Sequence, residues 1–297
     1  MSIRPLVGCG TALVTPFAAD GSVDEAALRA LVEWQVTEGV HFLVPCGSTG
    51  EAATLTPDEH HRVVAITVEQ VAGRVPVVAG AGSNDTQKAI VMSRRMREAG
   101  ATHLLHVSPM YNKPQQRGIV AHFRAIAEAV DVPIVVYNVP GRTASNIEAG
   151  TALALAAIPG IVAIKEASGN VGQVAEILRE RPPSFTVLSG DDALTLPIMA
   201  LGGDGVISVV SNVTPRRMAS LTEACRAGDF VAARILHRQL MPWMHAAFIE
   251  SNPAPVKCAL AMLGRAQDVL RLPLVPMAVS LHATVRAALV TAGAIDA

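Results

Sequence analysis

Lys165 follows the apolar run 161–164, so its side chain is expected to leave the end of a buried strand. An amine in apolar surroundings is poorly solvated in its charged form, which lowers its pKa. At an unperturbed pKa near 10.4, only roughly one lysine in 2,500 is a free amine at neutral pH. A free amine can attack a ketone and form an imine. The alternative is a buried lysine paired with Glu166 or another carboxylate, and position alone favours neither.

The chain contains three other lysines, Lys88, Lys113 and Lys257. Lys88 and Lys257 fall in helical stretches and Lys113 falls in an expected loop, so none of them begins at a strand end. Arginine cannot take this role, because its guanidinium does not deprotonate in proteins. Lys165 is therefore the candidate nucleophile.

The two tyrosines of the chain, Tyr111 and Tyr137, both lie where an apolar run ends. A phenol accepts and returns a proton while staying mostly neutral, which suits a relay through carbinolamine, imine and enamine intermediates. Each tyrosine taken alone is more typical of an amphipathic aromatic side chain at the rim of a fold. Their joint placement favours the catalytic interpretation.

Two further polar groups are candidates for binding anionic parts of a substrate. The segment Gly47-Ser48-Thr49-Gly50 offers backbone N–H groups and two hydroxyls to a carboxylate or phosphate, although this pattern alone has little specificity. Arg142 lies in a Pro-Gly turn and is able to bind a carboxylate through two parallel hydrogen bonds. A surface ion pair is the commoner role of a lone arginine.

The histidines are assigned structural roles. His103 and His106 are expected on opposite faces of one strand, so they cannot hold a metal together. His60 and His61 predict a solvent-exposed patch on a helix.

The cysteines predict reduced, mostly buried thiols. Cys9, Cys46, Cys225 and Cys258 stand alone and lack paired metal-ligand spacing, so neither a disulfide nor a zinc site is predicted. Cys46 precedes a glycine turn and has no identifiable base. Asp191-Asp192 suits either a substrate ligand or a helix N-terminus.

Apolar runs alternate with amphipathic stretches along the chain, which is typical of parallel strands joined by helices. Eight such runs are candidate strands, at residues 10–16, 40–46, 75–82, 103–109, 133–140, 161–168, 185–192 and 205–212. Eight units predict a closed (β/α)8 TIM barrel, whose active site lies at the carboxyl ends of the strands. An open doubly wound sheet is the alternative, but the first strand lacks a Gly-x-Gly-x-x-Gly turn.

Helix boundaries are also readable. Thr56-Pro57-Asp58-Glu59 predicts an N-cap, a first-turn proline and a capping-box glutamate, and Thr214-Pro215 repeats the opening. Gly39 and Gly100 are expected as left-handed residues after helix ends. Residues 1–213 are expected to form the barrel, and residues 214–297 the last barrel helix and a C-terminal helical extension of the same structural unit.

The bulk composition favours a small-molecule partner. The chain has 297 residues, of which 51% are hydrophobic, and this accommodates one barrel of roughly 250 residues plus extra helices. A formal net charge of -1 gives no reason to expect nucleic acid or an anionic membrane as partner. Because no leader or membrane-spanning run is readable, a cytoplasmic location is expected.

In combination, these segments resemble the dihydrodipicolinate synthase family of the N-acetylneuraminate lyase superfamily. The resemblance spans nearly the whole chain and rests on GSTGEAATL (47–55), SPMYNKPQQRG (108–118), YNVPGRT (137–143), IKEASGN (164–170), LSGDDALTL (188–196), GGDGVISV (202–209) and NPAPVK (252–257).

The resemblance implies that Lys165 forms an imine with pyruvate, while Tyr137 and Thr49 relay protons with Tyr111, which reaches into a neighbouring subunit's site. It also implies that the enamine attacks aspartate 4-semialdehyde, whose carboxylate Arg142 binds. The product would be 4-hydroxy-tetrahydrodipicolinate, on the route to lysine and diaminopimelate.

The resemblance further implies that Gly47 and Ser48 belong to the site and that the backbone carbonyls of Gly190 and Ile207 line it. Ser48 stands where many members have threonine, which keeps the hydroxyl. No metal or organic cofactor is expected, because the imine is the electron sink. A homotetramer built from two dimers is expected, and a dimer is the alternative.

Two other functions stay open on the same barrel. One is a related lyase or dehydratase, such as N-acetylneuraminate lyase or a 2-keto-3-deoxy sugar acid aldolase, which Arg142 and the segment 252–257 disfavour. The other is a non-catalytic pyruvate-binding regulator, which the complete set of candidate relay residues disfavours.

Feedback by L-lysine is expected to be weak or absent. Relative to strongly inhibited bacterial members, Pro57 replaces a histidine, Met110 a tyrosine, Lys88 a glutamate and Ala52 a serine. Lys88 places a positive charge where the ammonium group of the ligand needs an acid.

Overall fold

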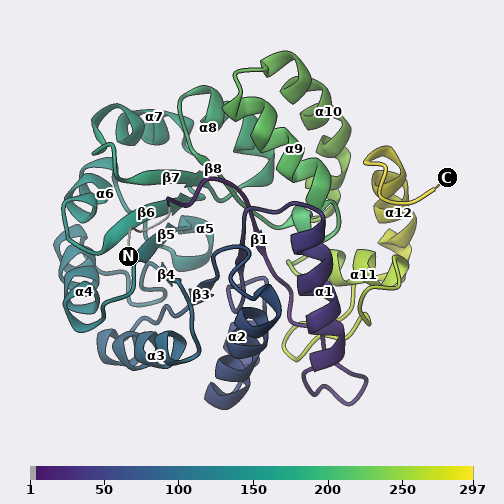
Figure 1. Cartoon of the computed structure of the whole chain (residues 1–297), viewed down its shortest axis with the longest axis horizontal. Helices are drawn as coiled ribbons and strands as arrows, with labels where there is room; N and C mark the ends of the chain where they lie inside the picture. Colours follow the sequence, from purple (N-terminus) through teal and green to yellow (C-terminus); the bar gives the residue numbers. More distant parts are fainter. Residues whose placement is uncertain (1–4, 297) are drawn as a thin grey trace.

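The computed structural model describes residues 5–296, which form a barrel of parallel strands surrounded by helices (Figure 1). The eight strands are β1 (Gly8–Ala12), β2 (Phe42–Val44), β3 (Val78–Gly80), β4 (His103–Val107), β5 (Ile134–Asn138), β6 (Ile161–Glu166), β7 (Thr186–Ser189) and β8 (Gly205–Ser208).

The α-helices are α1 (Glu25–Thr37), α2 (Pro57–Val71), α3 (Thr86–Glu98), α4 (Gln116–Ala129), α5 (Pro140–Thr143), α6 (Ala149–Ala156), α7 (Val171–Glu180), α8 (Thr195–Ala200), α9 (Pro215–Arg226), α10 (Phe230–Ala246), α11 (Ala254–Met262) and α12 (His282–Thr291). Short 3-10 turns are η1 (Ala52–Thr54), η2 (Asp192–Leu194), η3 (Val210–Asn212) and η4 (Val279–Leu281).

The strands pair in the order β2-β1-β8-β7-β6-β5-β4-β3. The remaining seam, between β2 and β3, is bridged by the parallel pair Leu43 and Val77. Backbone bonds from Leu43 N to Pro76 O and from Gly80 N to Pro45 O, both 3.0 Å long, complete this seam. The sheet therefore closes, and the predicted TIM barrel is confirmed.

Alternate residues of each strand point into the barrel, as the two-residue period of a strand requires. The interior cluster includes Val135 and Tyr137 of β5 and Ala163 of β6, together with Leu188 and Ile207. The residues between them face the helices and build the two outer clusters. A residue's position along its strand thus decides whether it faces the cavity.

All eight predicted strands are present, but each is shorter than the apolar run that predicted it. The run 10–16 is also shifted, because β1 begins at Gly8 where it pairs with Gly205 of β8. The extra apolar residues of the runs lie in the loops at the strand ends, where burial rather than sheet pairing explains their composition.

Helix boundaries follow the sequence closely at α2. The Thr56 side chain accepts from Glu59 N at 3.2 Å, and the Glu59 carboxylate accepts from Thr56 N at 2.8 Å, so the capping box is confirmed. Thr214 precedes α9 as expected, but its hydroxyl donates to Val210 O instead of capping the helix. Gly39 and Gly100 have φ values of 87° and 88°, as predicted.

The C-terminal part of the chain is helical, and the structure places no strand between Ser208 and residue 296. Helices α10 and α12 pack against each other beside α9 and α11 (Figure 1). None of the helices in residues 5–296 is long and apolar enough to cross a membrane.

The prediction of a solvent-exposed histidine patch was wrong for His60. Its side chain is buried, and its Nε2 lies 2.8 Å from Gly80 O, because this face of α2 packs against β3. The predicted buried thiols are confirmed, since Cys9, Cys46, Cys225 and Cys258 are all free and buried.

Candidate active site

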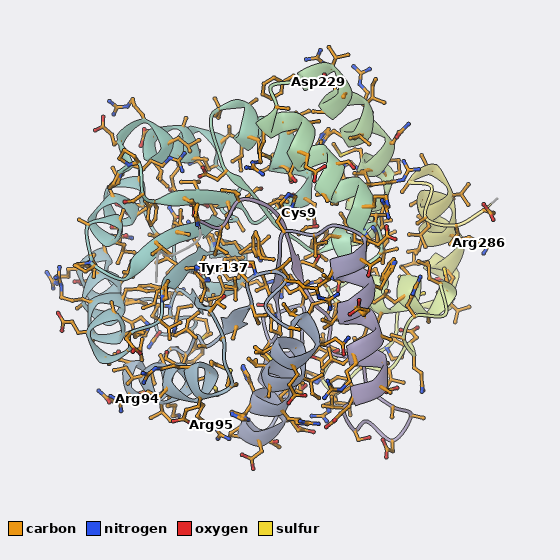
Figure 2. The ribbon with its side chains drawn as sticks, in the orientation of Figure 1. Cys9, Arg94, Arg95, Tyr137, Asp229 and Arg286 are labelled. Carbon is orange, nitrogen blue, oxygen red and sulfur yellow. The ribbon has the colours of Figure 1, made fainter. Side chains whose placement is uncertain are left out.

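A cavity of 490 Å³ opens at the carboxyl ends of the strands. Its lining includes Lys165, Tyr137, Thr49 and Arg142, which come from three segments of the chain, at the ends of β2, β5 and β6. Figure 2 shows Tyr137 among the side chains inside the ring of strands. The barrel therefore assembles the polar groups that the sequence placed at separate strand ends.

Lys165 is the fifth residue of β6 and points into the barrel beside Tyr137, its register partner on β5. The side chain is 5% exposed, and Nζ lies 4.3 Å from the centroid of the Tyr137 ring. Within residues 5–296 no carboxylate forms an ion pair with this amine. Burial lowers the pKa of Lys165 to about 8; the Asp192 carboxylate opposes that shift and the Arg142 guanidinium adds to it.

Glu166, the alternative partner for Lys165, faces the opposite side of β6. Its carboxylate accepts hydrogen bonds from Asn138 Nδ2 at 3.0 Å, Gln173 Nε2 at 3.0 Å and Ser168 N at 2.6 Å. Adjacent residues of a strand point to opposite faces, so Glu166 contacts the helical layer instead. The structure therefore excludes the Lys165–Glu166 pair.

Gly190 leaves room for the lysine side chain at the end of β7. A Cβ atom at this position would lie 2.6 Å from Cβ of Ala167 and 3.1 Å from Cε of Lys165. Only glycine lets the backbone approach the extended lysine so closely. The residue therefore shapes the cavity around the amine.

Tyr137 is 7% exposed, and burial raises the pKa of its phenol to about 12 against a small opposing effect of Arg142. The group is a neutral hydroxyl at pH 7. A neutral phenol close to an amine of lowered pKa is suited to donate and accept protons without carrying a lasting charge.

The turn after β2 supplies the hydroxyl groups. Thr49 is 4% exposed, and its Oγ1 accepts a hydrogen bond from Asn252 Nδ2 at 2.9 Å. Ser48 is exposed and lines the cavity together with Gly47. Because Thr49 Oγ1 accepts this hydrogen bond from Asn252, the hydroxyl proton of Thr49 is free to be donated into the cavity.

Arg142 lies in the short helix α5, directly after β5, and lines the cavity with an exposed side chain. No carboxylate in the described part of the chain pairs with it. The commoner role of a lone arginine, a surface ion pair, is thus not seen. An unpaired guanidinium at the cavity rim is suited to bind a carboxylate of a ligand.

Two sequence-predicted residues are not brought to this cavity. Tyr111 has a φ of 72°, is 89% exposed and does not line the cavity. Ile207 is fully buried in the barrel interior on β8, and the cavity lining does not include it.

The structure adds Asn252 to the site, a residue to which the sequence gave no role. Asn252 binds Thr49 from a position 203 residues further along the chain, inside the segment NPAPVK that carried part of the resemblance. Asp192 is 1% exposed and accepts from Val209 N and Val210 N at 2.9 and 3.1 Å. Of the two aspartates considered as substrate ligands or helix caps, Asp191 lines the cavity and also caps η2, accepting from Ala193 N at 2.9 Å, whereas Asp192 is not part of the cavity lining.

Residues of α10 and the loop after it also line the cavity, namely Met244, His245 and Phe248. Met244 and His245 belong to a predicted helical stretch and Phe248 follows it, and no strand end is near them in the sequence. A helical pattern does not reveal which residues reach the mouth of a barrel, so they were not predicted.

The closed barrel with a cavity at the carboxyl ends of its strands is the arrangement of TIM-barrel enzymes. The chain belongs to the dihydrodipicolinate synthetase family, whose model matches residues 5–292.

Individual relatives are similar to this chain over nearly its full length. The 4-hydroxy-tetrahydrodipicolinate synthase of Koribacter versatilis is 56% identical over 92% of this chain and 91% of its own. The dihydrodipicolinate synthase of Aquifex aeolicus has a solved structure with a TM-score of 0.93 and 44% identity, covering 96% of this chain and 97% of its own. A chloride-inhibited dihydrodipicolinate synthase from Acinetobacter baumannii, solved with pyruvate, has a TM-score of 0.96 and 40% identity, covering 97% of this chain and 99% of its own.

Proposed function

We propose that this chain condenses pyruvate with L-aspartate 4-semialdehyde to give 4-hydroxy-tetrahydrodipicolinate and water. The observation that carries the proposal is the buried amine of Lys165, which has no carboxylate partner in the described chain and lies 4.3 Å from the Tyr137 ring. The relatives' shared name and the pyruvate-bound Acinetobacter baumannii structure support the choice of substrates.

In the first step the free amine of Lys165 attacks the C2 carbonyl carbon of pyruvate and forms a carbinolamine. At a pKa of about 8, roughly one amine in ten is free at pH 7. Tyr137 donates a proton to the leaving hydroxyl, water departs and the imine forms. Thr49 and Ser48 donate hydrogen bonds to the pyruvate carboxylate from the turn after β2.

The positively charged imine then accepts electrons when Tyr137, which gave up its proton in the dehydration, takes a proton from the pyruvate methyl group. The resulting enamine attacks the aldehyde carbon of the second substrate, a new carbon–carbon bond forms, and Tyr137 returns the proton to the aldehyde oxygen, which becomes the hydroxyl of the product. Arg142 binds the carboxylate of that substrate at the rim of the cavity, which orients the aldehyde toward the enamine.

The amino group of the bound second substrate finally attacks C2, closes the ring and displaces the Lys165 amine. One water molecule is released over the whole cycle, and the lysine is regenerated. The protonated imine supplies the electron sink, so we propose that no metal or organic cofactor takes part in the reaction.

We propose that the functional assembly is a homo-oligomer, a tetramer of paired dimers. The support is Tyr111, which is 89% exposed and does not reach the cavity of its own chain. A neighbouring subunit would receive this phenol as part of its proton relay, and the backbone carbonyl of Ile207 would complete the substrate-binding wall. We also propose that the reaction takes place in the cytoplasm.

A coupled assay tests the proposed substrates. Turnover is measured with pyruvate and aspartate semialdehyde, and separately with N-acetylneuraminate and with a 2-keto-3-deoxy sugar acid. We expect turnover with the first pair alone, and loss of affinity for the semialdehyde, without loss of pyruvate binding, in Arg142→Ala. Faster turnover of either sugar acid would contradict the proposal and favour a related lyase.

We further propose that L-lysine inhibits the enzyme weakly or not at all. Lys88 is exposed on α3, and Met110 is half-buried in the loop after β4. Pro57 is the first residue of α2, and Ala52 lies in the short turn η1 before it. These side chains offer the ligand no carboxylate or phenol, and Lys88 repels its ammonium groups. A steady-state titration should show little inhibition by submillimolar lysine, and substantial inhibition there would contradict this part.

A further inference from the structure

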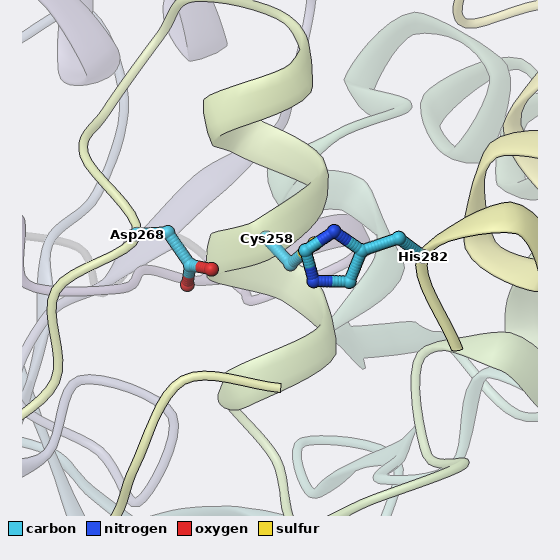
Figure 3. Close-up of side chains that lie close together, drawn as sticks. All are labelled: Cys258, Asp268 and His282. Atoms are coloured by element: carbon cyan, nitrogen blue, oxygen red, sulfur yellow. The ribbon is translucent and has the colours of Figure 1, made fainter. Parts of the chain in front are cut away.

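Three side chains of metal-ligand type meet in the C-terminal part of the molecule. Cys258 of α11, Asp268 of the following loop and His282 at the start of α12 bring ligand atoms within 4.8 Å of one another (Figure 3). Among the residues that the structure describes, this is the one group of three such side chains. None of the three lines the cavity around Lys165.

We propose that Cys258, Asp268 and His282 bind a zinc ion, with water as the fourth ligand. A thiolate, an imidazole and a carboxylate are the donor types that zinc accepts in tetrahedral sites. Harder ions such as Mg²⁺ and Ca²⁺ prefer sets made only of oxygen, so the sulfur and nitrogen donors select against them.

The separations between the three ligand atoms can be compared with those around a bound zinc ion. Tetrahedral ligands at zinc distances of about 2.0–2.3 Å lie roughly 3.3–3.7 Å from one another. Starting from separations within 4.8 Å, side-chain rotations that move each ligand atom by less than about 1 Å bring the set to bonding distance. The three residues come from two helices and the loop between them, so the ion would join these elements.

Two polar atoms at the cluster favour a ligand there. Oδ1 of Asp268 is buried and has no hydrogen-bond partner among the described residues, and an unpaired buried carboxylate oxygen is costly. Nε2 of His282 lies 3.4 Å from Met277 O. A proton on Nε2 directed at this carbonyl leaves Nδ1 with its lone pair, and metal-binding histidines commonly hold their second nitrogen in this way.

Cys258 must lose its proton when the ion binds. Burial and the nearby Asp268 carboxylate raise the pKa of the thiol to about 11, so without an ion the group is protonated at pH 7. Binding of Zn²⁺ therefore releases one proton from sulfur to solvent and forms one zinc–thiolate bond. No electron is transferred, and affinity rises with pH.

The ion would stabilise the segment that supports the active-site turn. Lys257, next to Cys258, donates to Val269 O at 2.8 Å, and Val269 follows Asp268. The same Lys257 amine lies 2.5 Å from Oε1 of Glu51, which is two residues after Thr49. Two of the proposed ligands, Cys258 and Asp268, are thus next in sequence to Lys257 and Val269, which this hydrogen bond joins. The Lys257 amine also forms the buried ion pair with Glu51, close in sequence to the Thr49 hydroxyl.

Cobalt and zinc titrations of the tag-free, chelator-treated protein test the site. Co²⁺ bound through a thiolate gives a near-ultraviolet charge-transfer band, and tetrahedral coordination gives intense visible bands. We expect one Co²⁺ per chain with both features, displacement by one equivalent of Zn²⁺, and a higher melting temperature in the zinc form.

Variants assign the ligands. Cys258→Ser should abolish the charge-transfer band, and Asp268→Asn and His282→Gln should each weaken zinc binding by at least roughly ten-fold. Cys225→Ser is the matched control, because it removes another free buried cysteine and should leave binding unchanged. His282 is half-buried at a helix start, so its variant keeps the test valid if Cys258→Ser does not fold.

Absence of the charge-transfer band in the wild-type protein would overturn the proposal. So would equal zinc affinity in the wild type, His282→Gln and Asp268→Asn, which would mark the binding as adventitious. Neither result would bear on the proposed condensation, because that reaction is measured without added metal.

Discussion

Two lysines of this chain are buried, and their surroundings differ in one decisive respect. Lys165 lies in the barrel mouth beside Tyr137, and no carboxylate of the described chain pairs with it. Lys257 is fully buried in α11, where its Nζ lies 2.5 Å from Glu51 Oε1, 2.8 Å from Val269 O and 4.1 Å from the centroid of the Phe17 ring.

Burial alone therefore does not decide whether one of these lysines is reactive. Burial lowers the pKa of both amines, but at Lys257 the Glu51 carboxylate acts directly against that effect, and its carboxylate oxygen holds the ammonium in place. At Lys165 the opposing carboxylate, Asp192, forms no ion pair with the amine, and Arg142 adds to the lowering. A paired lysine stabilises the structure, whereas an unpaired one is available to attack a carbonyl.

Replacing Lys165 should produce the largest effect on activity. Lys165→Met removes the nucleophile, and kcat is expected to fall by roughly 10⁴-fold or more. The free energy of unfolding should stay the same or rise, because an unpaired buried amine is replaced by an apolar side chain. The coupled assay and urea denaturation measure the two effects. Retention of a tenth of the activity would mean that another residue forms the imine.

Removing the phenol of Tyr137 tests the proton relay. Tyr137→Phe should lower kcat by roughly 10²- to 10⁴-fold, which is the usual contribution of general acid–base catalysis. The pKa of Lys165 should change little, because the ring remains, so the pH midpoint of the rate serves as the internal control. A variant with near wild-type kcat would exclude Tyr137 from the relay.

The opposite outcome is expected for Lys257. Lys257→Met leaves the Glu51 carboxylate buried without its partner, and the free energy of unfolding should fall by about 3–5 kcal/mol. The paired variant Lys257→Met with Glu51→Gln should recover much of the loss. Urea denaturation measures both. Equal stability of the single variant and the wild type would show that the ion pair is not structural.

The pH dependence gives a smaller effect. With a pKa of about 8, the free-amine fraction of Lys165 rises roughly ten-fold per pH unit below pH 8 and then levels off. The rate with pyruvate, kcat/KM, should follow that curve. Asp192→Asn should move its midpoint to lower pH and Arg142→Gln to higher pH, since these charges raise and lower the pKa respectively. Unmoved midpoints would show that neither charge acts on the amine.

Much of the fold was readable because a parallel strand covered on both faces must be apolar throughout. The same logic identified Lys165, since a charged residue at the end of such a run needs a reason. Local caps such as Thr56 with Glu59 were also predictable, because their partners are three residues apart.

Contacts between distant segments were not predictable. Lys257 was predicted to be an ordinary lysine of a helix, because no nearby residue in the sequence shows that Glu51 lies beside it in the fold. The same applies to Asn252 and Thr49, and to the ligands of the proposed zinc site, whose spacing matches no paired motif. His60 was misjudged because a polar residue on the inner face of a helix looks exposed until its backbone partner is known.

Borohydride reduction in the presence of pyruvate tests whether Lys165 forms the imine. The protein is treated with both reagents, digested and analysed by mass spectrometry, with borohydride alone as the control. We expect one reduced pyruvate adduct per chain, on the peptide that contains Lys165, and an unmodified Lys257 peptide. An adduct on Lys257, or no pyruvate-dependent adduct at all, would contradict it.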